Sequence, residues 1–382
     1  VLGSLVALPA LLAILGKRID KAVIRKSAIT PKEDGRWAQT ARFVMRRPLA
    51  VVVLSLVILS VLAAPVKNIV FSQVDSRVLP ANNPAAFASK IISDRFPGQE
   101  GNPVEIVIPK GALVQPEVTK YISEVSKVDG IVRVSPPQIF GNDLRITAVH
   151  SMPPRTLKGE SLIKDIREIK SPEGTLIGGI AADYADTQIG IAKTMPWALT
   201  WIAVGVLILL FVFTGSIILP IKAVILNILS LAATLGAITW IFVDGHLRWL
   251  VGDFTVTGAV DTGSIILVAV VAFGLSMDYE LFLLSRIKEE HDAGKSNIES
   301  VAIGLQRSAR IITAAAGLLA IVFASFIISG VTSIKMLGFG VAFAILLDAT
   351  LVRALLVPAL MRLFGERNWW APKSMKRFTI NH

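Results

Sequence analysis

The sequence predicts a membrane protein that combines six transmembrane helices with one ferredoxin-like α/β domain outside the bilayer. Three observations lead to this fold class. The 382 residues are 53% hydrophobic and only 18% charged. The apolar residues gather in blocks as long as a bilayer is thick. One long polar segment between two such blocks alternates short strand patterns with amphipathic helix patterns.

Composition excludes several classes of site. The chain has no cysteine, which excludes disulfides, zinc-thiolate sites, iron-sulfur clusters and a cysteine nucleophile. The four histidines lie far apart and outside the apolar blocks, so we expect no metal and no other cofactor. The formal net charge is +11, but the basic residues flank hydrophobic blocks. Nucleic acid is therefore not an expected partner.

The transmembrane helices follow from apolar runs long enough to cross about 30 Å of hydrocarbon. Four runs are uncharged, and two further stretches carry internal charges. In chain order these six segments are 48–66, 194–221, 223–243, 262–285, 311–331 and 336–363. Residues 1–15 are apolar but too short to span alone. We expect them to be the end of a preceding transmembrane helix.

The distribution of basic residues predicts the orientation. The linker 16–48 holds ten basic and three acidic residues, and the tail 365–382 is also basic. Both should face the cytoplasm. This places 67–193 outside, between a first transmembrane helix at 49–66 and a five-helix bundle at 194–364. The linker mixes apolar residues with its charges, which suits interfacial helices on an anionic leaflet.

The outer segment reads as an α/β domain. The runs at 104–108, 131–134, 144–149 and 176–180 are rich in β-branched residues and predict strands. Helix patterns cover 84–95, 116–127 and 160–170. From Val104 onward the order is β-α-β-β-α-β, which is the split ferredoxin-like pattern. We expect a sheet with helices on one face.

An internal repeat links the two ends of the chain. The segment 6–18 aligns without gaps to 355–367, with identical proline, alanine, leucine, glycine and arginine positions. Two apolar helix ends can be similar by chance. Duplication is the stronger interpretation, and it predicts that the chain begins at the end of one structural repeat and contains the whole of the next, as in transporter architectures.

Three phrases resemble a known family. They are Phe96-Pro-Gly, the run Gly-Leu-Ser-Met-Asp-Tyr-Glu at 274–280, and Leu-Asp-Ala-Thr-Leu-Val-Arg at 347–353. They are similar to those of the MmpL-type (mycobacterial membrane protein, large) branch of the resistance-nodulation-division transporters. The resemblance implies the C-terminal half of a twelve-helix, proton-driven exporter of the bacterial plasma membrane, with a porter domain after the first helix of each repeat.

Asp278 is the first candidate site residue. It lies eight residues before Arg286, about 12 Å along a helix. A bare carboxylate in hydrocarbon costs a few kcal/mol or more, so Asp278 must be protonated much of the time or face a polar partner. This predicts a proton carrier, with a packing anchor as the alternative. The resemblance implies that Asp278 and Tyr279 face an equivalent pair in the other repeat.

Three further charges lie within the predicted spans. Glu280 is expected to snorkel or to pair with a basic residue at a helix end. Asp348 and Arg353 are five residues apart, so on an α-helix they share no face, and each is expected to find a partner on another helix. Arg353 is interpreted as part of a structural ion pair. Asp348 is either a packing anchor or the second member of the proton relay.

The sequence contains no phosphate-binding Gly-x-x-x-x-Gly-Lys-Ser/Thr loop and no catalytic triad. We expect no enzyme, but one half of a proton-coupled exporter of lipids or other hydrophobic compounds. Its partners would be the missing N-terminal repeat or an equivalent half, membrane lipids and a hydrophobic substrate. The alternatives are a non-transporting scaffold or sensor with a partner-binding outer domain, and a half-size translocase working as a dimer. Homo-oligomerisation is left open.

Overall fold

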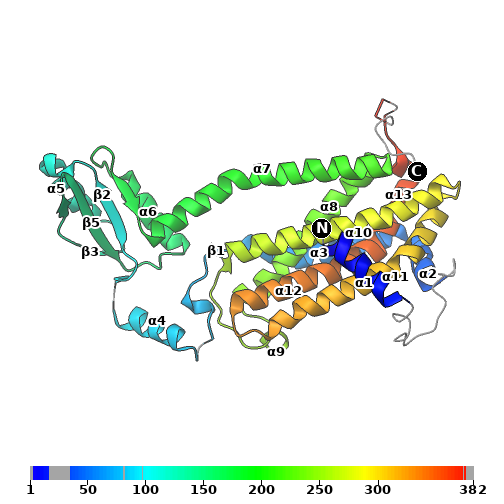
Figure 1. The fold of residues 1–382 in the computed structure, drawn as a ribbon, viewed down its shortest axis with the longest axis horizontal. Helices are drawn as coiled ribbons and strands as arrows, with labels where there is room; N and C mark the ends of the chain where they lie inside the picture. The colour runs from blue at the N-terminus through cyan, green and yellow to red at the C-terminus, as the bar shows by residue number, and fades with distance from the viewer. Residues whose placement is uncertain (1–2, 17–34, 81, 97, 373, 376–382) are drawn as a thin grey trace.

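The computed structural model describes residues 3–16, 35–80, 82–96, 98–372 and 374–375. A helical bundle and a small α/β domain lie at opposite ends of the molecule, and the long helix α7 (Ile180–Thr214) joins them (Figure 1). We call the end of the bundle farthest from the α/β domain the distal end.

The described part of the chain contains six helices that are long and apolar enough to cross a membrane. They are Pro48–Asn68, Ile180–Thr214, Ile218–Val243, Thr262–Asp292, Asn297–Ile328 and Thr332–Trp369. These correspond to the six predicted segments, which confirms that part of the fold class. A helix satisfies its own backbone hydrogen bonds, so it is the element that hydrocarbon permits. Several helices extend well beyond the apolar blocks, because polar residues continue the same hydrogen-bonding pattern outside the bilayer.

The bundle is built from α3, α8, α10, α11, α12 and their extensions. Their bounds are α3 (Pro48–Ala63), α8 (Ile218–Ile238), α10 (Thr262–Asp292), α11 (Asn297–Ala324), α12 (Thr332–Leu347), the π-helix η8 (Asp348–Leu356) and α13 (Val357–Phe364). Short helices at its ends are α1 (Leu8–Leu15), α2 (Arg36–Arg46) and α9 (Arg248–Val251). One apolar core cluster combines α2, α3, α8, α10, α11 and α13.

The connecting helix α7 crosses the expected boundary between residues 193 and 194 without a break. Its first turns belong to the α/β domain, because Ala181, Ala182 and Ala185 are buried in that domain's core. It ends at Gly215, whose φ of 68° lies in the left-handed region that favours glycine. Helix α7 therefore runs from the α/β domain into the bundle as one continuous element.

The α/β domain contains a five-stranded antiparallel sheet. Its strands are β2 (Val104–Ile108), β3 (Ile131–Val134), β4 (Gln138–Phe140), β5 (Asp143–His150) and β6 (Leu176–Gly178), with the spatial order β3-β5-β2-β6 and β4 beside β5. Helix α5 (Gln115–Val125) lies between β2 and β3 in the chain, and α6 (Leu157–Glu168) between β5 and β6.

Alternation along β2 explains how this sheet packs. Val104, Ile106 and Ile108 are fully buried, whereas Val107 is exposed. The buried face packs against α5, α6 and the start of α7. Strand β4 is absent from the sequence prediction because all three of its residues are exposed, so the segment has no alternating burial pattern to detect.

Helix α4 (Pro84–Arg95) has the bounds that its pattern indicates, with Asn83 capping its first turn through a bond to the Ala85 amide. None of its residues is buried. The chain before it is attached to the bundle by a two-residue parallel pair, in which β1 (Phe71–Ser72) lies beside β7 (Val260–Asp261). The Tyr184 hydroxyl of α7 donates to the Phe71 carbonyl over 3.0 Å.

The internal repeat is also visible in local structure. A π-helix, η1 (Gly3–Ala7), leads into the eight-residue α1, which ends at Gly16 with φ 47° and ψ −134°. The π-helix η8 leads into the eight-residue α13, which ends at Gly365 with φ 52° and ψ −133°. The aligned positions thus have matching elements and matching backbone angles, which supports duplication over chance similarity.

Gly236 permits a close contact between α8 and α3. A Cβ atom there would lie 2.0 Å from the Leu62 carbonyl oxygen of the α3 span. Small residues at such crossings let backbones approach closely. We therefore expect Gly236→Ala to lower stability in detergent by about 1–3 kcal/mol, as overpacking does. Thermal unfolding of the purified protein measures this.

Gly205→Ala on α7 is the matched control, because nothing lies within 4 Å of the added Cβ. This variant should leave the midpoint of thermal unfolding unchanged or raise it slightly, since alanine favours helix. Equal midpoints for the two variants would contradict the packing assignment.

Candidate functional site

A buried ion pair occupies the interior of the bundle. The Asp348 Oδ2 and Arg353 Nη2 atoms are 2.5 Å apart, and the two residues are 6% and 3% exposed. Ser276 of α10 completes the contact, because its hydroxyl donates to Asp348 Oδ1 over 3.0 Å and its carbonyl oxygen accepts from Arg353 Nη2. The guanidinium lies over the Tyr279 ring, 5.2 Å from its centroid. The pair thus connects the last transmembrane segment with α10.

The expectation that Asp348 and Arg353 share no face and pair with other helices was wrong. They pair with each other because residues 348–356 form a π-helix, in which the Val357 amide donates to the Val352 carbonyl five residues earlier. Residues five apart are then neighbours on one face, as residues four apart are on an α-helix. The expectation that Arg353 forms a buried ion pair agrees with this geometry.

Glu280 also departs from its expected position. It is only 5% exposed, so it does not snorkel to a helix end. Arg353, Asp348 and Lys222 are the charged groups near it. A small cavity bordered by Glu280 and Lys222 lies between α8, α10 and α13. Glu280 is buried because it follows Ser276 by four residues, about one helical turn. Both side chains therefore point to the same interior face of α10.

Asp278 lies away from this cluster. It is exposed on an outer face of α10, in a stripe with Leu267, Val270 and Gly274 that recurs every three to four residues. Tyr279 lies between the two faces and is half-buried. The structure therefore brings Tyr279, Glu280, Asp348 and Arg353 together and leaves Asp278 apart. No group of three or more potential metal ligands occurs among the described residues.

Lys222 was not among the sequence candidates. It lies near the start of α8, and its Nζ donates to Asn368 Oδ1. Ser276 was also missed. The available signal for Lys222 was a lone cation between two long uncharged runs, which sequence reasoning treated as a boundary. For Ser276 the signal was weaker, because a single serine in an apolar helix is common.

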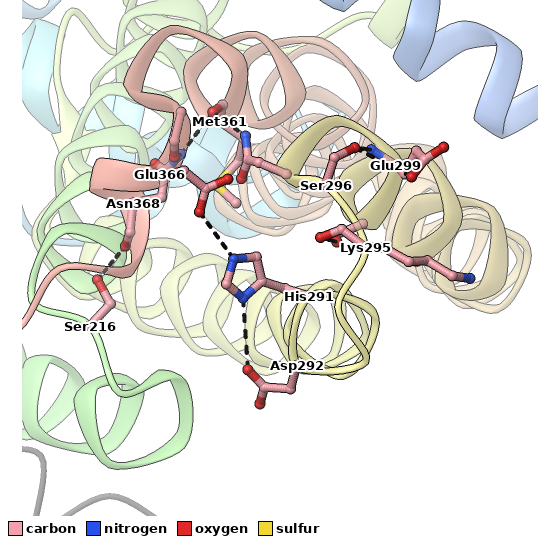
Figure 2. Close-up of polar contacts among 12 residues, drawn as sticks. Ser216, His291, Asp292, Lys295, Ser296, Glu299, Met361, Glu366 and Asn368 are labelled. Atoms are coloured by element: carbon pink, nitrogen blue, oxygen red, sulfur yellow. Dashed lines mark hydrogen bonds and ion pairs between the residues drawn. The ribbon is translucent and has the colours of Figure 1, made fainter.

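A polar cluster closes the distal end of the bundle (Figure 2). The Ser216 hydroxyl donates to the Asn368 carbonyl oxygen over 2.5 Å, and the amides of Asn368 and Asn297 both donate to the Met361 carbonyl, over 2.7 and 2.9 Å. His291 stacks on Trp369 and contacts Glu366 over 3.2 Å. These contacts tie the end of α13 to the α7-α8 turn and the α10-α11 loop.

A second, larger hollow lies in the α/β region. It has a volume of about 650 Å³ and is bordered by α4 and the loops around residues 75–79, 98–102 and 153–155. Apolar Leu79, Phe87 and Ile92 line it beside charged Arg77 and Arg155. Arg77 is paired with Asp75 over 2.6 Å, and Arg155 donates to the Val74 carbonyl over 2.7 Å. The lining therefore combines apolar and polar surface.

Comparisons with known proteins agree with this architecture. Residues 154–380 match the MMPL family. A membrane protein of Streptomyces coelicolor is 37% identical over 98% of this chain and 52% of its own length. The trehalose monomycolate exporter MmpL3 of Mycobacterium tuberculosis is 32% identical over 98% of this chain and 44% of its own. MmpL11 of Mycolicibacterium smegmatis, a mycolic acid-containing lipids exporter, is 32% identical over 98% of this chain and 41% of its own length.

The six apolar helices of the described residues, with charged side chains buried among them, define a multi-pass membrane protein. The chain belongs to the MMPL family. It spans about half the length of the relatives that it matches.

The Asp348–Arg353 contact can be tested as a pair. Removing one partner leaves a buried charge uncompensated, which costs about 3–5 kcal/mol. We expect Asp348→Leu and Arg353→Met each to lower the unfolding midpoint strongly, and the double variant to lose less than the sum of the two. Thermal or denaturant unfolding in one detergent gives the coupling energy.

The control cycle uses Glu105 and Arg145, a partly exposed pair 2.9 Å apart on β2 and β5. Exposed pairs contribute about 0–1 kcal/mol, so this coupling should be small. Equal coupling energies in the two cycles would show that Asp348 and Arg353 do not act as a buried pair.

Proposed function

We propose that this chain is the C-terminal half of a proton-driven exporter that moves lipids or other hydrophobic compounds out across the plasma membrane. Two named relatives are lipid exporters, and each aligns over nearly the whole of this chain and less than half of itself. The observation that carries the proposal is the interior cluster of Asp348, Arg353 and Glu280. Ionisable groups inside a membrane bundle are costly and mark ion pathways by default.

In this proposal the relay works by changing which charges need partners. Asp348 ionised holds Arg353, and Ser276 fixes the carboxylate by its hydroxyl bond. A proton on Asp348 weakens that attraction, and Arg353 then has Glu280 as its remaining nearby acid. The two arrangements favour different helix packings, which is how protonation biases a conformational equilibrium. One charge crossing a potential of about 100 mV supplies about 2.3 kcal/mol.

Asp278 and Tyr279 complete the proposed relay from the other side of α10. The exposed stripe that holds Asp278 is where the other repeat would pack. Asp278 would then face a polar partner there rather than lipid, and Tyr279 would lie between that partner and Arg353. The half-buried position of Tyr279, with Arg353 over its ring, supports this intermediate role.

We further propose that the α/β domain is an extracytoplasmic porter domain of ferredoxin-like fold. The strand order β3-β5-β2-β6 with α5 and α6 as its crossovers supports this assignment. The hollow beside α4 would form part of the substrate path. Its apolar lining suits a hydrophobic chain, and its paired charges suit a polar head group.

Proton coupling is tested in a complete transporter that contains this half. Asp278→Asn and Asp348→Asn keep side-chain shape but cannot carry a proton, so each should abolish proton-dependent export. Tyr279→Phe removes one hydroxyl and should impair export less completely. Substrate flux in vesicles with an imposed proton gradient measures both effects.

The control is Asp253→Asn, a highly exposed aspartate in the loop before α10, which should leave flux unchanged. Wild-type flux in both relay variants, with normal insertion, would exclude the relay and favour a scaffold or sensor. A half-size translocase would instead transport when this chain is reconstituted alone.

The orientation is tested by labelling, which the absence of cysteine makes simple. Ser161 lies on the exposed side of α6, and Ser374 is exposed at the distal end. An impermeant thiol reagent should label Ser161→Cys in intact cells, and Ser374→Cys only after the membrane is opened. The reverse pattern would invert the proposed topology.

A further inference from the structure

Helix α2 lies at the distal end of the bundle, where the chain enters its first span (Figure 1). One side of α2 is buried through Ala38, Ala41, Val44 and Met45. The Ala38 amide donates to Gln306 Oε1 of α11 over 3.1 Å. Only residue 47 separates α2 from α3. The C-terminal end of α2 is therefore fixed at the boundary of the bilayer.

The opposite side of α2 is exposed and combines cations with an aromatic ring. Arg36, Phe43 and Arg46 are seven and three residues apart, so they lie on one helical face, and all three are exposed. Phe43 is 72% exposed, and Leu49 at the start of α3 is 64% exposed. Exposed apolar side chains beside arginines are what an interfacial helix presents to lipid.

The arginines of this face lack the ion pairs that several arginines of the α/β region make. Arg77, Arg133, Arg145 and Arg167 of the α/β region each contact an aspartate or glutamate at 2.6–2.9 Å. Arg36, Arg46 and Arg47 contact no acidic side chain within the described ranges. Arg46 and Arg47 are adjacent, whereas Arg36 lies at the other end of α2, about 15 Å along the helix. Neighbouring cations with no acidic contact among the described residues produce a local positive potential at the membrane boundary.

We propose that Arg46 and Arg47, with Phe43, form a binding site for an anionic phospholipid in the leaflet at the distal end. The guanidinium groups suit a phosphate because their planar donors match its oxygens. Phe43 and Leu49 lie where the acyl chains of the same lipid begin. A soluble phosphate would use the arginines alone, so the apolar residues favour a lipid. This inference does not depend on export or proton coupling.

The test compares lipid binding to the purified chain in a neutral detergent. Native mass spectrometry measures adducts with phosphatidylglycerol and with phosphatidylcholine of the same acyl chains. Arg46→Gln/Arg47→Gln should reduce phosphatidylglycerol binding by about tenfold, since each cation near an anionic head group adds to affinity. Phosphatidylcholine binding should stay the same. Phe43→Ser should weaken phosphatidylglycerol binding without changing the binding of inorganic phosphate.

The matched control is Lys127→Gln/Lys170→Gln, which removes two exposed charges from the α/β domain and should leave lipid binding unchanged. Arg46→Lys/Arg47→Lys keeps the charges and should retain the preference for phosphatidylglycerol over phosphatidylcholine. This variant separates lost affinity from misfolding. Undiminished phosphatidylglycerol binding in a folded Arg46→Gln/Arg47→Gln variant would overturn the site. An unchanged affinity in Phe43→Ser would assign the arginines to a soluble anion instead.

Discussion

The buried ion pair of Asp348 and Arg353 depends on a local departure from α-helical geometry, and the centre of the bundle is arranged around it. On an α-helix these two charges would point in different directions into apolar surroundings, where each would need its own partner. The π-helix from residue 348 to 356 places them 2.5 Å apart. Ser276 then supplies an acceptor and a donor from α10, so the same contact that satisfies the charges also fixes two helices against each other.

Polar groups continue from this pair toward the distal end. Glu280 is the next acid, a small cavity separates it from Lys222, and Lys222 donates to Asn368. Asn368 in turn contacts Ser216 and Met361, which hold the distal end closed. The interior charges and the distal cluster are thus connected through one lysine. The polar and charged groups thus form a line from the interior cluster to the helix ends.

Much of the fold was predictable because it follows from periodicity and composition. The six spans are long apolar runs, and the strand at 104–108 alternates buried and exposed residues as its sequence indicates. The interior site was only partly predictable. The charges of Glu280, Asp348 and Arg353 are evident in the sequence, but their positions depend on helical phase. Nothing in the sequence of residues 348–356 distinguishes a π-helix from an α-helix. The contacts that accompany the π-helical form come from Ser276 and Tyr279 on another helix. Lys222 was missed because its role depends on Asn368, which is distant in the chain.

The continuity of α7 has a mechanical consequence. Its 35 residues form a rod of about 50 Å, rooted at one end in the α/β core and at the other beside the buried Ser216. A tilt of only about 5° at the distal end would displace the far end by about 4 Å, which follows from the length of the rod. Pro196, within the helix, has no backbone N–H to donate, and the missing helical hydrogen bond makes α7 easier to bend there. A rearrangement of the bundle helices that tilted α7 would therefore displace the α/β domain by more than the bundle itself moves.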